Sequence, residues 1–103
     1  MARDINGQWA ITQSTGHELM FDIVQDANGF LHGSGQVIGG REANAHGQLT
    51  GDSFVYQVDW NNNGKGGRYT GTFNEQGHLK GSTEDLDNPG STATWFAHGF
   101  IHT

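Results

Sequence analysis

The sequence predicts an all-β protein, an eight-stranded antiparallel up-and-down β-barrel. Apolar and polar residues alternate with a period of two in most segments, as half-buried strands require. The 103 residues include 17 glycines and one proline, and the glycines interrupt every run that could form an amphipathic helix. Strand and turn signals recur about every dozen residues, and a meander of short hairpins exposes two edges unless it closes. We therefore expect one closed barrel domain over residues 1–103.

The first three strands are joined by tight turns. Residues 5–13 place Trp9 and Ile11 on one face of the first strand. Glu18–Gln25 alternates in the same way and forms the second strand. The segment Asp26–Gly29 contains Asn-Gly, which tolerates positive φ and predicts a hairpin into a third strand over residues 30–38.

The middle of the chain contains the clearest strand. Gly39–Asn44 is predicted as a loop, and residues 46–50 as a short fourth strand. The fifth strand has four large apolar residues on one face: Phe54, Tyr56, Val58 and Trp60. Asn61–Gly67 is too rich in glycine and asparagine for a strand and is predicted as a loop.

The last three strands follow the same pattern. They are predicted over residues 68–74, 78–83 and 91 to about 98, with an acidic connection over Glu84–Gly90. Four segments place an apolar residue two positions before a glycine, as in Tyr69-Thr70-Gly71 and Leu79-Lys80-Gly81. Such glycines relieve crowding where strands coil tightly.

Composition excludes several classes of function. The formal charge is −6 and the five cations are scattered, whereas a nucleic-acid-binding protein needs clustered positive charge. No cysteine is present, so disulfides and thiolate chemistry are excluded. No apolar run approaches the roughly 20 residues of a membrane span. We expect a soluble protein without membrane or nucleic-acid partners, and the localisation stays open, secretion after removal of a leader included.

Metal and catalytic motifs are absent from the sequence. The six histidines are dispersed, and His98 and His102 would lie about 13 Å apart along one strand. Gly33-Ser34-Gly35 lacks the spacing of a nucleophile elbow. We therefore predict no metal, no cofactor and no catalytic residues, and an enzyme is the less favoured interpretation.

Several segments resemble the avidin and streptavidin family. Residues 5–9 (Ile-Asn-Gly-Gln-Trp) are similar to the first strand of those proteins, and residues 27–34 to their turn and third strand. Residues 56–62 (Tyr-Gln-Val-Asp-Trp-Asn-Asn) look like the family's aromatic-x-Val-x-Trp-x-Asn strand, and residues 69–73 follow as an aromatic-x-Gly segment. The resemblance implies a streptavidin-like barrel that binds biotin or a related small molecule at its open end, usually as a homo-oligomer.

The resemblance also assigns individual positions. Trp60 matches a tryptophan of the family's ligand wall, Tyr69 stands where another ring sits, and Ser14 or Thr15 could occupy the place of a ligand-binding serine. Three parts of the sequence depart from the family pattern, and one is the loop before Tyr69, where Lys65, Gly66 and Gly67 stand in place of hydroxyl groups. Ile11 replaces an asparagine of the first strand, and Gly35 stands where a ureido-binding tyrosine is expected. The ligand itself therefore stays open.

The chemistry of the aromatic residues agrees with the region that the resemblance implies. Rings with polar tips suit a small cyclic ligand or a sugar, and the alternative is that the rings simply fill the core. We expect the site between the first hairpin, Gly39–Asn44 and Asn61–Gly67. The predicted ligand-binding residues are Ser14, Thr15, Trp60, Asn61, Tyr69 and Trp95.

Two other functions fit the composition. One is an oligomeric lectin or protein-interaction module that uses polar and aromatic side chains on the outer face of the barrel. The other is a lipocalin-like enzyme or cyclase that holds its substrate inside the barrel.

Overall fold

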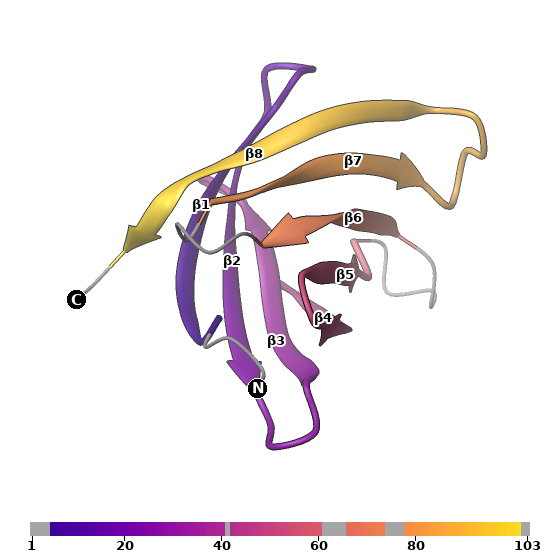
Figure 1. Cartoon of the computed structure of the whole chain (residues 1–103). Coiled ribbons are helices and arrows are strands. Elements are labelled where there is room, and N and C mark those ends of the chain that lie inside the picture. Colours follow the sequence, from indigo (N-terminus) through magenta and orange to yellow (C-terminus); the bar gives the residue numbers. More distant parts are fainter. Residues whose placement is uncertain (1–4, 41, 61–65, 74–77, 102–103) are drawn as a thin grey trace.

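The structure is a computed structural model that describes residues 5–40, 42–60, 66–73 and 78–101. Each strand is antiparallel to the next, and the last pairs with the first, so the sheet is closed (Figure 1). This confirms the predicted eight-stranded up-and-down barrel. No helix among the described residues is long and apolar enough to cross a bilayer. The strands are β1 Gly7–Gln13, β2 Glu18–Gln25, β3 Phe30–Val37, β4 Glu42–Thr50, β5 Ser53–Val58, β6 Gly67–Phe73, β7 Leu79–Asp85 and β8 Thr92–Ile101.

Some strand boundaries differ from the prediction. β4 begins at Glu42 and not at residue 46, so the last part of the predicted Gly39–Asn44 loop is strand. Its inward residues there are Ala43 and Ala45, whose small side chains give only a weak alternation signal. β5 ends at Val58, and Trp60 therefore lies in the connection after the strand rather than within it.

The inward face of the barrel is packed with large apolar side chains. Phe21 lies at the centre of an aromatic cluster, with its ring centroid 5.2 Å from Tyr56, 4.9 Å from Tyr69 and 6.4 Å from Trp95. Trp9 fills the opposite end of the barrel, where its ring is 5.5 Å from Phe73. Each fully buried large apolar side chain contributes about 1.5–3 kcal/mol of burial free energy.

Closure depends on the pairing of β1 with β8. The ladder joins Gln8 to Ile101 at one end and Gln13 to Trp95 towards the other, with a register shift between Trp9 and Ile11. Just beyond the ladder, Ser14 donates its backbone N–H to the Thr94 carbonyl at 2.8 Å, and its Oγ accepts the Thr94 N–H at 3.1 Å. β1 therefore begins at the end of the barrel where β8 finishes.

Two glycines face each other across β6 and β7, where the two backbones lie close together. Gly71 pairs with Gly81, and both belong to the apolar-x-Gly repeat. A Cβ at Gly81 would lie 1.8 Å from the Thr70 carbonyl oxygen and 2.5 Å from the Gly71 Cα. Backbone atoms cannot move aside without breaking the ladder, so glycine is required here.

This contact predicts a stability difference between two glycine variants. Gly81→Ala should lower the free energy of unfolding by about 3 kcal/mol or more, because overpacking against backbone cannot relax. The control is Gly39→Ala, where φ is +86° and no atom lies within 4 Å of the added Cβ. It should cost only about 1 kcal/mol for the left-handed backbone. Urea unfolding of both variants measures the difference, and equal losses would contradict close approach at Gly81.

Candidate ligand-binding site

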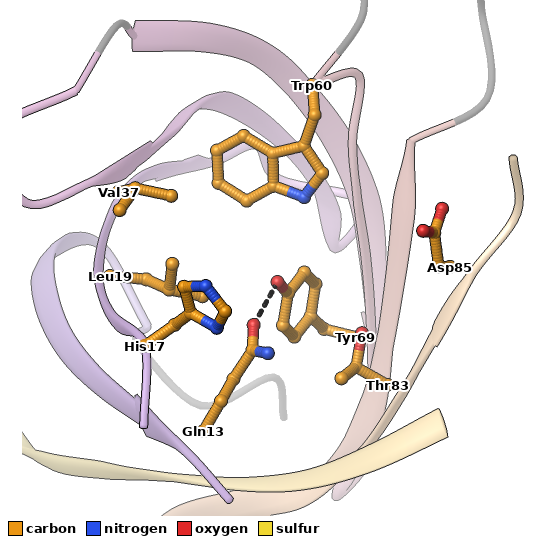
Figure 2. Close-up of a pocket in the computed structure, with 8 residues that line it drawn as sticks. All are labelled: Gln13, His17, Leu19, Val37, Trp60, Tyr69, Thr83 and Asp85. Carbon is orange, nitrogen blue, oxygen red and sulfur yellow. Dashed lines mark hydrogen bonds between the residues drawn. The ribbon is translucent and has the colours of Figure 1, made fainter. Parts of the chain in front are cut away.

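A pocket opens at the end of the barrel where β1 turns into β2, β3 into β4, β5 into β6 and β7 into β8. Its volume is about 370 Å³, within the range of small-molecule sites. Figure 2 shows Trp60, Leu19, Gln13 and Tyr69 arranged around the opening. The lining residues are Gln13, His17, Leu19, Val37, Trp60, Tyr69, Thr83 and Asp85.

One wall of the pocket is apolar and is held in place by two glycines. Trp60 is half-buried and packs on the core beside Leu19 and Val37. Gly66 has φ +79°, and a Cβ there would lie 1.9 Å from the Val58 carbonyl oxygen. A Cβ at Gly67 would lie 3.0 Å from Trp60 Nε1 and 3.3 Å from Tyr69 Cε1. The two glycines therefore let the indole and the phenol ring sit close together.

The other wall is a chain of hydrogen bonds that leads from the barrel interior to the rim. The Tyr69 hydroxyl donates to Gln13 Oε1 at 2.6 Å (Figure 2). Gln13 Nε2 donates to Thr15 Oγ1 at 3.2 Å, and Thr15 Oγ1 lies 2.7 Å from His17 Nδ1. This chain fixes the amide of Gln13 and so orients the polar groups that face the pocket.

Tyr69 is the buried polar centre of the site. Burial raises the pKa of its hydroxyl to about 12, and the nearby charge of Asp85 acts in the same direction. Hydrogen bonding by Thr83 and Trp60 opposes this shift because it stabilises the phenolate. Burial has the larger effect, so the phenol stays protonated at neutral pH.

The structure brings some of the predicted site residues together. Trp60 and Tyr69 both line the pocket, and Thr15 reaches it through Gln13. The Ser14 side chain instead accepts a backbone hydrogen bond from Thr94, at the closure of the barrel. Asn61 lies outside the described residues.

Trp95 lies below the pocket in the aromatic cluster. Its side chain is 2 % exposed, and its Nε1 donates to the Ser82 carbonyl at 2.8 Å. Its ring centroid is 6.0 Å from that of Tyr69 and 5.6 Å from that of Phe54. Trp95 therefore supports Tyr69 from beneath and is not among the residues that line the pocket.

Sequence reasoning missed four polar residues of the pocket wall. Gln13 continues the inward face of Trp9 and Ile11, and this parity could have identified it. Thr83 shares the inward face of Gly81 and could have been identified in the same way, whereas Asp85 lies beyond the predicted end of this strand at Thr83. His17 sits in the first hairpin, where no alternation pattern indicates the direction of a side chain.

Two positions where the resemblance leads us to expect polar groups are packed with apolar side chains. Ile11 is 1 % exposed and belongs to the core. A Cβ at Gly35 would lie 2.8 Å from both methyl groups of Val58, so Val58 occupies the space that a larger side chain at Gly35 would need. Within the described ranges, no group of three or more histidines and carboxylates is placed to hold a metal ion.

Comparison with known proteins identifies the fold. The barrel superimposes on a single-residue variant of shwanavidin in complex with biotin, with a TM-score of 0.61 and 16 % sequence identity over 93 % of this chain and 99 % of that one. The chain has an avidin-like fold. Apo shwanavidin gives a TM-score of 0.57 at 16 % identity over 94 % of this chain and 99 % of that one. No family model and no curated protein sequence matches.

The burial of both tyrosines predicts the pH dependence of stability. Burial also raises the pKa of Tyr56 above its usual value, and the chain has two tyrosines. The folded protein therefore holds both phenolic protons more tightly than the unfolded chain does. Its free energy of unfolding should fall as the pH rises from about 10, the unfolded value, towards the higher folded values.

Ultraviolet absorbance of tyrosinate measures this directly. The native protein should show little tyrosinate at about pH 10.5, whereas the protein in urea should be more than half ionised there. A native titration with its midpoint near pH 10 would contradict the burial of the two hydroxyls.

Proposed function

We propose that this protein is a small-molecule binding barrel that captures its ligand without a covalent bond in the pocket beside Trp60 and Tyr69. The pocket carries this proposal, because a partly exposed indole and a buried phenol meet there above a filled aromatic core. The avidin-like fold supports it, since one structural neighbour is a complex with biotin.

The apolar wall and the hydrogen-bonded wall of the pocket would make different contacts with a ligand. The face of Trp60, with Leu19 and Val37, would remove the flat surface of a ring from water. Gln13 and Thr83 would offer hydrogen bonds to the polar edge of the ring, and the bonds that hold Gln13 would reduce the entropy lost on binding.

Biotin is the first compound to test and not the assigned ligand. Ile11 and Val58 occupy core space where the resemblance leads us to expect polar contacts to a ureido ring. The pocket is therefore shallower and less polar at its base than those contacts would require. A small ring compound with a polar edge is the ligand class we propose.

The proposal predicts different effects for two aromatic variants. Calorimetry with biotin and a panel of ring compounds first identifies the ligand that binds most tightly. Trp60→Leu should weaken binding of that ligand by roughly tenfold or more. Phe96→Leu is the matched control, because Phe96 is 49 % exposed and does not line this pocket. It should change affinity less than about twofold. Equal losses in both variants, with unfolding midpoints unchanged, would reject this placement of the site.

A second candidate function uses the outer face of the barrel. Val24, Phe30 and Val55 are 57 %, 47 % and 39 % exposed and lie on β2, β3 and β5. Phe30 and Val55 both pair with Gln48 of β4, so they flank one residue of the sheet. An interaction module or a homo-oligomer would cover such a face. Light scattering after size exclusion reports whether the protein is a homo-oligomer, and a glycan array reports whether it binds sugars. Both measurements on wild type and on Phe30→Ser separate use of the outer face from capture in the pocket.

A further inference from the structure

The walls of the pocket have a marked charge asymmetry. Asp85 is the carboxylate among the residues that line it, and it lies at the rim, two residues beyond Thr83 on the inward face of β7. The other lining residues are the exposed His17 and side chains that are apolar or carry an amide, an indole N–H or a hydroxyl group. No lysine or arginine of the described residues lines the pocket.

Acidic residues also outnumber basic ones in the strand ends and turns around the pocket. Two described cations lie on the strands beside Asp85. Arg68 lies on the outer face of β6, paired across the ladder with Glu84, and Lys80 lies near the start of β7, at the other end of that strand from Asp85. Arg41 and Lys65 lie outside the described residues. The carboxylates in the strand ends and turns that form the mouth are Glu18, Glu42, Asp59, Glu84, Asp85 and Asp87.

We propose that the pocket selects ligands in which a flat ring bears a cationic group, such as a protonated amine or an amidinium, and disfavours ligands that bear a carboxylate. This inference rests on the proposed function and defines its ligand class. The ring would lie against Trp60, and the cation would lie between Asp85 and the aromatic walls.

Two physical effects act together in this arrangement. A cation near the face of an indole or phenol ring is attracted by the ring quadrupole, and this attraction grows as water is excluded. A mouth lined by charge of one sign raises the local concentration of ligands of the opposite sign. The second effect is screened by salt, so selectivity for cations should weaken as the ionic strength rises.

Asp85 can be neutralised without disturbing its turn. Its Oδ1 accepts the backbone N–H of Asp87 at 3.0 Å, and an asparagine at this position keeps that acceptor. Asp87→Asn is the matched control, because it removes the same charge from the same turn at a position that does not line the pocket. Both residues are exposed, so both variants should fold.

The test uses two sets of three probes in which the ring is constant and the charge varies. One set is tryptamine, tryptophol and indole-3-propionate; the other is biotinyl-ethylenediamine, biotin methyl ester and biotin. Calorimetry on wild type should rank cation above neutral above anion in at least one set. The cation-to-anion ratio of affinities should be about fivefold or more in about 0.01 M salt and should shrink in about 0.15 M salt.

The two variants then decide the role of Asp85. Asp85→Asn should reduce the cation-to-anion ratio by about threefold to fivefold, whereas Asp87→Asn should leave it within about twofold. Binding with no charge preference, with preference for the anion, or with a ratio that Asp85→Asn leaves unchanged overturns this inference and leaves the proposed function standing. Absence of binding by all six probes overturns both.

Discussion

The pairing of β1 with β8 is the constraint on which the rest of the structure depends. A meander of eight strands has two edges whose N–H and C=O groups lack partners, and only closure removes both. Closure also defines an inside, where the alternating apolar residues can meet, and two ends, one of which holds the pocket. The contacts between Ser14 and Thr94 belong to this closure, which explains why a serine predicted to bind ligand has a structural partner instead.

Packing inside the barrel sets the depth of the pocket. Phe21, Tyr56 and Trp95 fill the middle of the barrel with rings in tilted and edge contacts, and Tyr69 forms the upper layer of this cluster. The space that remains lies above Tyr69 and beside Trp60. Glycines keep this arrangement compact, because Gly67 lets the two rings approach and the pair of Gly71 and Gly81 lets β6 and β7 draw together. The buried rings therefore stabilise the core, and Tyr69, which packs on them, also lines the site.

Much of the fold could be predicted because its signal is local. Alternation in Glu18–Gln25 and around Tyr56 shows which side chains face inward, and the Asn-Gly turn shows where a hairpin forms. Trp60 and Tyr69 were predicted as site residues from the family resemblance and from the chemistry of their rings, and both line the pocket. The remainder of the site depends on long-range geometry. Gln13 meets Tyr69 across 56 positions of sequence, and no local pattern indicates such a contact. For the same reason the sequence could not show whether Trp95 lines the pocket or packs beneath it.

The ladder between Gln8 and Ile101 brings the start of β1 and the finish of β8 to the same side of the molecule, away from the mouth formed by the hairpin turns near Gln13 and Asp85. The chain thus enters β1 and leaves β8 behind the barrel, so a tag, a fused enzyme or a bead attached beyond these two strands would leave the mouth open to solute.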